Sequence, residues 1–327
     1  MSALGAYPDE EERERELERL CARAGGTIVT FGTSVGGRPM RGARVPSTSP
    51  GAPRVLVNAN IHGPEHIGSL TAMAVLRALA EERAVELRAA AEVLVVPCVN
   101  VDGFARTVRT GGRGSLKELR CNDRGVDLNR NFPLPTVGDA GSLWGLVGKR
   151  AITIAGSGDP ARATWRGPAP LSEPEARALH ELALAERFAS AVSLHSFMGT
   201  FIPPCVRTRD EARRYASLVA VARRAQRRRY LRLQAPFFDV FTGELEDHLH
   251  HATGTWAITI ECFTLAQTFR QHLRAPTLFW RFNPIDPAPV IDNDAPAVIA
   301  FLRAAVSASH PRRAPASARP DSGTIAG

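Results

Sequence analysis

The sequence predicts an α/β fold in which helices cover both faces of a central sheet. Two observations lead to this prediction. Short apolar segments with the composition of strands alternate along the chain with longer segments of helical spacing, and this alternation is typical of α/β proteins. In addition, 44% of the 327 residues are hydrophobic, which is enough to bury a large core.

The positions of the elements follow from hydrophobic periodicity. Strands are expected over residues 27–31, 54–58, 92–96, 191–194 and 256–260. Helices are expected over residues 9–24, a stretch that ends near 83, 172–187, 209–229 and a shorter stretch after Gly243. Pro64 suits the first turn of its helix because that position needs no N–H donor. Ser172 and Glu175 have the spacing of a capping box, which begins the following helix.

One long internal segment and the C-terminal tail are predicted to lack regular structure. Residues from about 97 to 170 are rich in glycine, proline and arginine and show little periodicity, and loops of that length are usually functional or disordered. The chain is therefore expected to comprise a charged N-terminal helix within residues 1–26 and one large domain over 27–307. A disordered tail, rich in proline, alanine, serine and arginine, is expected over 308–327.

Composition limits the possible classes of protein. No apolar run approaches the ~20 residues that cross a bilayer, and the charged N-terminus does not resemble a signal peptide, so a cytoplasmic protein outside the membrane is expected. Five scattered cysteines without a C-x-x-C pair argue against a disulfide framework or a thiolate zinc site. The net charge of +8 would suit an anionic partner, but a solvated helix face explains it equally well. Nucleic acid is therefore not the expected partner.

Histidines and carboxylates occur where three of the expected strands end. His62 and Glu65 lie in the loop after one strand, and His195 and Glu261 follow two others. The carboxyl ends of strands in an open α/β sheet shape the usual site, and a catalytic zinc commonly takes two histidines, a carboxylate and an open position for water. His62, Glu65 and His195 meet this requirement. The H-x-x-E pattern alone is weak, because Glu65 could instead complement a helix dipole.

A longer segment carries a resemblance to a known family. Residues 125–133, Gly-Val-Asp-Leu-Asn-Arg-Asn-Phe-Pro, strongly resemble the signature of the zinc carboxypeptidases related to pancreatic carboxypeptidase A. Further segments that match in the same order are 100–103, 165–168 with 172–175, 194–197, and 243–247 leading to 260–261. The likeness spans about residues 27–305. It implies a three-layer α/β/α sandwich with a central mixed, mostly parallel sheet, a Zn²⁺ cofactor, and small peptide substrates with a free C-terminal carboxylate.

The resemblance also implies roles for single residues. Asn129 and Arg130 would bind the substrate's terminal carboxylate, since a guanidinium meets a carboxylate with two parallel hydrogen bonds. Asp127 would orient the ligand His62 by accepting its other ring proton; the alternative is a turn aspartate that bonds its own backbone. Glu261 would act as general base towards the attacking water, and the alternative is a surface glutamate at a strand edge.

Two further assignments concern the reacting carbonyl and the side-chain pocket. Arg120 matches the position at which bacterial relatives carry the arginine that stabilises the carbonyl oxygen. Arg113 and Arg124 compete for this role, and a solvated basic loop would explain all three. Glu246 falls where the family lines its side-chain pocket, and an acid there would favour a C-terminal Lys, Arg or other amine-bearing residue. The alternative is that Glu246 stabilises the N-terminus of a helix.

The chain departs from the family at two positions. Many relatives carry a tyrosine four residues before the glycine that corresponds to Gly243, and this position is Asp239 here. Pro64 replaces the arginine that pancreatic-type enzymes carry before the ligand glutamate, and bacterial relatives that trim peptidoglycan fragments lack this arginine too. Surface or structural roles are expected for the other histidines considered, which are His66, His248, His250, His251 and His272.

The resulting prediction is a zinc-dependent carboxypeptidase. One alternative is a zinc deacylase that resembles succinylglutamate desuccinylase or aspartoacylase, which shares the ligand pattern but hydrolyses N-acyl amino acids. The other is a catalytically inactive nucleic-acid-binding or scaffold protein, which the basic stretch over 223–229 would suit. The sequence leaves the oligomeric state open.

Overall fold

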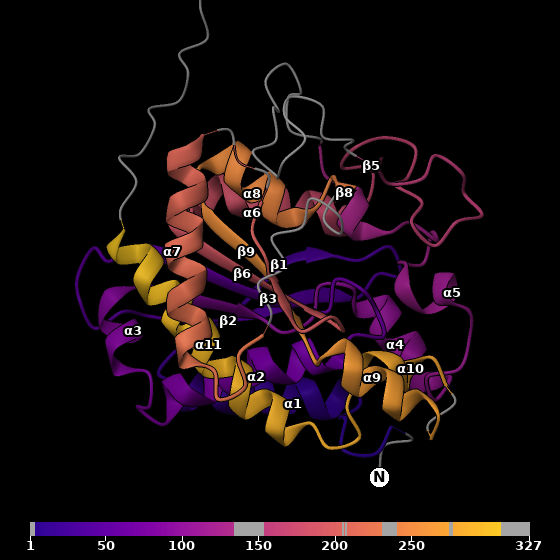
Figure 1. The fold of residues 1–327 in the computed structure, drawn as a ribbon, viewed down its shortest axis with the longest axis horizontal. Coiled ribbons are helices and arrows are strands. Elements are labelled where there is room, and N and C mark those ends of the chain that lie inside the picture. Colours follow the sequence, from indigo (N-terminus) through magenta and orange to yellow (C-terminus); the bar gives the residue numbers. More distant parts are fainter. Residues whose placement is uncertain are drawn as a thin grey trace, which may run out of the picture.

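A seven-stranded mixed sheet forms the centre of the computed structural model, which describes residues 4–133, 154–204, 206, 208–230, 241–274 and 277–308 (Figure 1). The strand order is β1-β2-β4-β3-β6-β9-β7. The strands are β1 (Thr27–Thr33), β2 (Pro39–Val45), β3 (Arg54–Ala59), β4 (Glu92–Val96), β6 (Ser190–Ser196), β7 (Thr200–Ile202) and β9 (Trp256–Cys262). A separate parallel pair consists of β5 (Ile154–Ala155) and β8 (Phe241–Thr242).

Four neighbouring strands of the large sheet run parallel. β4, β3, β6 and β9 pair in this way, whereas β1, β2 and β7 pair antiparallel with their neighbours. The prediction of a mixed, mostly parallel sheet is thereby confirmed. Because the four parallel strands end at the same edge, the loops that follow β3, β6 and β9 are brought together there.

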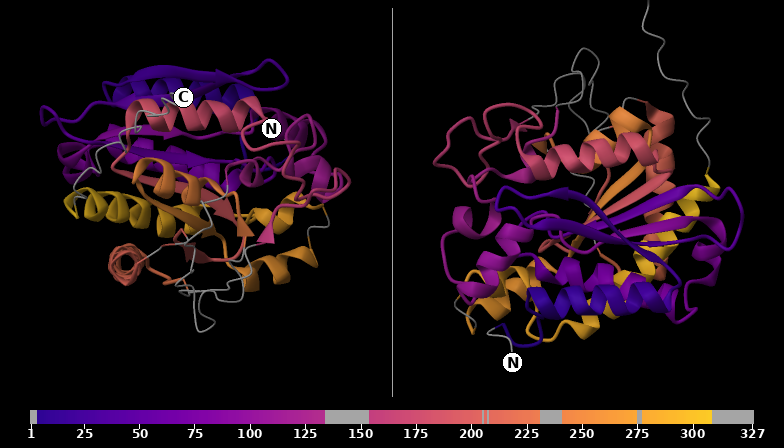
Figure 2. Two further views of the ribbon diagram at one scale, coloured as in Figure 1. Left: turned by 90° about the horizontal axis from the view of Figure 1, so that it is seen from above. Right: turned by 180° about the vertical axis from the view of Figure 1, so that it is seen from behind.

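Helices cover both faces of the sheet (Figure 2). The first face carries α1 (Glu10–Arg23), α2 (His66–Ala80), α3 (Val85–Ala90) and α11 (Ala288–Ser307), with α7 (Arg209–Ala225) packed beside α11. The second face carries α6 (Pro174–Glu186) and α8 (Leu245–Thr253). α4 (Val101–Arg109) follows the end of β4 and contacts α1 and α5. The shorter helices are α5 (Leu116–Arg120), α9 (Leu265–His272), α10 (Phe279–Phe282) and a 3₁₀ turn over Leu128–Arg130. This arrangement confirms the predicted three-layer α/β/α class.

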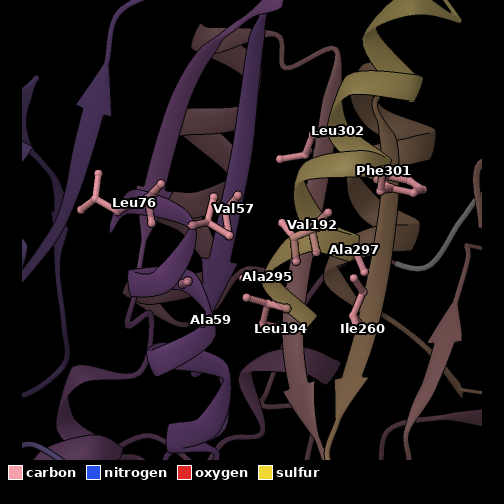
Figure 3. Packing of buried hydrophobic residues seen from close by; sticks show 14 of the residues in the cluster. Val57, Ala59, Leu76, Val192, Leu194, Ile260, Ala295, Ala297, Phe301 and Leu302 are labelled. Atoms are coloured by element: carbon pink, nitrogen blue, oxygen red, sulfur yellow. The ribbon is translucent and has the colours of Figure 1, made fainter. Parts of the chain in front are cut away.

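Alternation along the central strands separates core residues from site residues. Val192 and Leu194 of β6 and Ile260 of β9 pack against α11 on the first face, where Phe301 is fully buried (Figure 3). Successive side chains of a strand point to opposite faces, so His195 and its neighbours of the same parity point to the second face. The carboxyl end of the sheet therefore has one apolar face and one face that can carry chemistry.

Several expectations about single elements are wrong. β2 was not predicted, yet it pairs with both β1 and β4. Arginines interrupt its apolar residues and form ion pairs at the sheet surface, as Arg44 does with Glu186. The segment expected to be a loop from 97 onwards contains α4 and α5. α4 begins where the Asn100 side chain accepts a hydrogen bond from the Gly103 backbone N–H. This helix is too short to show the repeated hydrophobic spacing by which the longer helices were predicted.

The two expected helix starts also differ from the structure. Pro64 precedes the helix rather than occupying its first turn, since Glu65 is the N-cap of α2. Ser172 does not form a capping box, because Glu173 is the N-cap of α6 and Pro174 its first residue. The Ser172 hydroxyl instead accepts a hydrogen bond from Asn131 Nδ2 and donates one to Glu173.

Some expectations concern residues outside those described. The disordered tail falls almost wholly in 309–327, and Asp239 lies in 231–240, both of which are outside the described ranges. Within those ranges, no helix combines the length and the apolar character needed to cross a membrane.

Candidate metal centre and active site

The loop after β3 is shaped by one asparagine and one glycine. Asn60 adopts a positive φ of 55°, and its side-chain amide donates to the carbonyl oxygens of His62 and Gly63. A Cβ atom on Gly63 would lie 2.3 Å from the carbonyl oxygen of Leu119, so this position has room for glycine alone. The Gly63 N–H donates to the Arg120 carbonyl at 3.2 Å. The loop is thus pressed against the end of α5.

Three buried side chains converge at this loop. His62 Nδ1 lies 2.8 Å from one Glu65 carboxylate oxygen, and His195 Nδ1 lies 3.1 Å from the other. The two Nδ1 atoms are 3.2 Å apart. Two atoms that bind one tetrahedral zinc ion at roughly 2.1 Å are separated by about 3.4 Å. The predicted donor set of two histidines and a carboxylate therefore has the separations that a zinc ion needs. Among the described residues, these three side chains form the cluster that could hold a metal ion.

The second nitrogen of each histidine is held by another side chain. His62 Nε2 lies 3.2 Å from Asp127 Oδ1, the contact that the resemblance implied. His195 Nε2 lies 3.2 Å from Ser193 Oγ, which donates in turn to Asn58 Oδ1 at 2.9 Å. Such contacts fix the ring orientation and leave each Nδ1 available as a metal ligand. Ser193 and Asn58 were not predicted, although an asparagine in the otherwise apolar strand β3 was a usable signal.

Asp127 is the centre of a buried charge network. Its Oδ2 accepts from Arg120 Nε at 2.9 Å, and its Oδ1 also accepts from the Asn129 N–H at 3.1 Å. Burial alone would raise the pKa of Asp127, but the charges of Arg120 and His62 outweigh it and hold the pKa well below its usual range. The same competition holds for Glu65, whose pKa is lowered by His62 and His195 against the effect of burial. Both carboxylates are therefore ionised at neutral pH.

Of the three candidate arginines, Arg120 alone reaches this network. Its Nη1 lies 3.9 Å from Glu65 Oε1. Arg113 is exposed, and Arg124 is an exposed residue whose Nη1 lies 3.8 Å from Glu173. Because α5 ends beside Gly63, Arg120 is the arginine that the fold brings to the metal loop.

Glu261 lies beside His195 on the neighbouring strand, β9. β9 runs between β6 and β7, so Glu261 pairs with His195 on one side and Thr200 on the other. It is not at a sheet edge. The residue is partly covered, but its Oε2 atom is fully buried and has no hydrogen-bond partner among the described residues. Burial, followed by repulsion from Glu65, raises the pKa of Glu261 to about 8.

The start of α8 is attached to the segment that contains Asn129 and Arg130. Asn129 Oδ1 accepts from the Leu245 N–H at 3.0 Å, and Arg130 Nη1 donates to Glu244 Oε1 at 2.6 Å. Glu246 is 2% exposed, and its Oε2 accepts from Thr259 Oγ1 at 3.0 Å. Thr259 shares a strand face with Glu261. The contact between Arg130 and Glu244 was not predicted, because the sequence shows no spacing that relates the two residues.

Most of the other histidines take structural positions. His66 stacks on Phe104 with a centroid distance of 4.0 Å, and burial lowers its pKa to about 3. His248 Nε2 lies 2.8 Å from His180 Nδ1, and burial lowers the pKa of His248 to about 4. His250 is hydrogen-bonded to Tyr215. The side chain of His272 is outside the described part of the structure.

This fold and donor set place a candidate metal centre at the carboxyl end of the parallel strands of an α/β sheet. A family model described as zinc carboxypeptidase matches residues 19–263, which is more than half of the chain. The chain therefore belongs to the zinc carboxypeptidase family, and it carries a candidate zinc site at His62, Glu65 and His195.

Individual relatives agree with this assignment. A metallocarboxypeptidase A-like protein of Trichophyton verrucosum is 28% identical over 187 residues, covering 54% of this chain and 41% of that protein. Human carboxypeptidase D is 32% identical over 166 residues, covering 39% of this chain and 12% of the human protein. This chain thus matches less than half of the length of either relative. The fold is similar to that of bovine thrombin-activatable fibrinolysis inhibitor in complex with tick carboxypeptidase inhibitor, with a TM-score of 0.70, 18% identity, and coverage of 93% of this chain and 98% of that one.

Proposed function

We propose that the protein removes the C-terminal residue of small peptides by attack of water on the last amide bond. The observation that carries this proposal is the position of Glu261, which pairs with His195 and has one buried oxygen without a hydrogen-bond partner among the described residues. His195 is itself one of the three candidate metal ligands. A carboxylate in that position can take up a proton from water at the metal centre.

Each residue of the site has a distinct part in the proposed reaction. Zinc held by His62, Glu65 and His195 would supply a Lewis acid and lower the pKa of water toward ~7. Glu261 accepts the proton from the attacking water and later delivers it to the leaving amine. Arg120, held in place by Asp127, donates to the oxygen of the reacting carbonyl as negative charge develops there.

Recognition of the substrate's end is assigned to the segment beside α8. Asn129 Oδ1 accepts a hydrogen bond from the Leu245 N–H. This contact fixes the orientation of the Asn129 amide, whose NH₂ group would then donate to the substrate. Together with Arg130, this NH₂ would bind the terminal carboxylate. Glu246 supports a preference for a C-terminal residue that carries an amine, because its buried carboxylate is already ordered by Thr259. Glu246 also lies in the first turn of α8, so it stabilises that helix start as well.

A mass-spectrometric screen tests this proposal. Zinc-loaded protein is incubated with peptides that differ only in the C-terminal residue, with the peptidoglycan tripeptide, and with matched peptides whose C-terminus is an amide. Release of Lys or Arg in preference to neutral residues, with no cleavage of the amides, is expected. Cleavage of the amides would contradict the roles of Asn129 and Arg130.

Adding N-acyl amino acids to the screen, and measuring nucleic-acid binding beside it, separates the two alternatives. Turnover of N-acyl amino acids but of no peptide would identify a deacylase. Absence of turnover, combined with salt-sensitive binding of nucleic acid, would instead favour an inactive binding protein. Location in the cytoplasm stays a prediction, which fractionation of the source cells would test.

A further inference from the structure

The arginine proposed to bind substrate already contacts a carboxylate of the protein itself. Arg130 Nη1 donates to Glu244 Oε1 at 2.6 Å, and the same nitrogen donates to the Asn129 carbonyl at 2.6 Å. The side chains of Arg130 and Glu244 are 6% and 11% exposed. A charge-assisted contact of this length, shielded from water, is among the stronger hydrogen bonds in proteins.

Glu244 is held in this position by the backbone on both sides of it. Gly243 has a φ of +86°, and a Cβ atom there would lie 3.1 Å from the Arg130 carbonyl oxygen, so the chain makes a close approach that suits glycine. The Gly243 carbonyl accepts from the Phe132 N–H at 3.2 Å. On the other side, the Leu245 N–H donates to Asn129. Glu244 therefore lies between two attachments to the segment it contacts.

We propose that Glu244 is a specificity-determining residue that competes with the substrate's carboxylate for Arg130. The proposal rests on the proposed function of Arg130 as part of the carboxylate-binding site. In the free protein, the Glu244 carboxylate takes the position of a substrate carboxylate on Nη1. An incoming carboxylate must displace Glu244 or share the guanidinium with it, and two carboxylates on one guanidinium repel each other. Ligands that offer only a carboxylate consequently bind weakly.

A purely structural role for Glu244 predicts a different outcome. If the ion pair served only to attach α8, then Glu244→Gln would lower the stability of the fold, since it weakens a buried charge pair. It would not strengthen the binding of carboxylates. The competitor role requires that removal of the negative charge makes Arg130 easier to reach, so affinity and stability change in opposite directions.

Calorimetric binding of 6-aminohexanoate to the zinc-loaded, full-length protein tests the proposal. This probe has a carboxylate and an amine but no amide bond, so binding is measured without hydrolysis. Glu244→Gln should tighten its binding by about tenfold, because a like charge next to the bound carboxylate is removed. Binding of 6-aminohexanamide, which lacks the carboxylate, should be unchanged. Glu181→Gln, an exposed change of the same charge on α6, should have no effect and serves as the matched control.

Two further measurements make the result specific. In an Arg130→Gln background, Glu244→Gln should no longer tighten binding, because the gain acts through Arg130. Glu244→Ser provides a second variant without the charge, and thermal unfolding shows whether each variant is folded. Binding that is no tighter in the folded Glu244 variants, or a gain that persists without Arg130, would overturn the proposal. A tenfold gain in a protein that cleaves no peptide would instead count against the proposed reaction while supporting competition at Arg130.

Discussion

Replacement of Asp127 by asparagine tests how far the site depends on a residue that touches neither metal nor substrate. Asp127 receives hydrogen bonds from His62, Arg120 and the Asn129 backbone. Asparagine keeps the volume but removes the charge, and its NH₂ group must face one of these donors. Loss of a carboxylate behind a ligand histidine typically weakens metal binding by about 10- to 100-fold, which corresponds to roughly 1.4–2.7 kcal/mol. The upper part of this range is expected, because Arg120 also loses its nearest counter-charge.

Zinc affinity of the Asp127→Asn variant is measured by competition with a chromophoric chelator. Asp123→Asn is the matched control, since Asp123 is an exposed aspartate of the same segment, and its zinc affinity should equal that of the wild type. The variant should also unfold at a lower urea concentration than the control, because a buried arginine has lost its partner. Wild-type zinc affinity in Asp127→Asn would refute the view that this carboxylate orients His62.

Three other changes have expected outcomes. Glu261→Gln should retain zinc in elemental analysis but lower kcat by about 10²- to 10⁴-fold, and loss of the zinc would point to a ligand role instead. Gly63→Ala should cost about 1–3 kcal/mol in urea unfolding, since its Cβ would meet the Leu119 carbonyl; an unchanged midpoint would contradict this. Burial raises the pKa of Asp294 in the folded protein to about 6. The unfolded chain therefore loses this proton at lower pH than the folded protein, and the stability of the fold falls as the pH rises from about 4 through 6. The stability of Asp294→Asn relative to wild type should therefore increase by about 2 kcal/mol between pH 4 and pH 7, and a pH-independent difference would contradict this.

The metal-binding residues could be predicted because their identity and their position after strands carry independent information. His62, Glu65 and His195 are residue types that bind zinc, and each follows a strand, where the ends of parallel strands must meet at one edge of a sheet. The contact of Asp127 with His62 was anticipated only through the family signature. Asp127 is 65 residues from His62 in the sequence, so the periodicity of a helix or strand could not predict this contact.

Other features depend on information that local patterns do not contain. β2 and α4 are each stabilised by contacts with distant segments, as when Arg44 of β2 pairs with Glu186 of α6. The pairing of Arg130 with Glu244 joins residues 114 positions apart. This pairing depends on the close approach of Gly243 to the Arg130 backbone. The sequence shows that residue 243 is a glycine, but it does not show which segment packs against it.

Two glycines explain why suitable residue types alone do not build this site. Gly63 lets the metal-binding loop press against the last turn of α5, and that contact brings Arg120 to within 3.9 Å of Glu65. Gly243 lets the start of α8 approach the Arg130 backbone, and that contact places Glu244 on the guanidinium. In both cases, backbone meets backbone where a side chain would have kept the segments apart. Close packing of the main chain at these two glycines therefore positions the charged side chains around the metal centre and the carboxylate site.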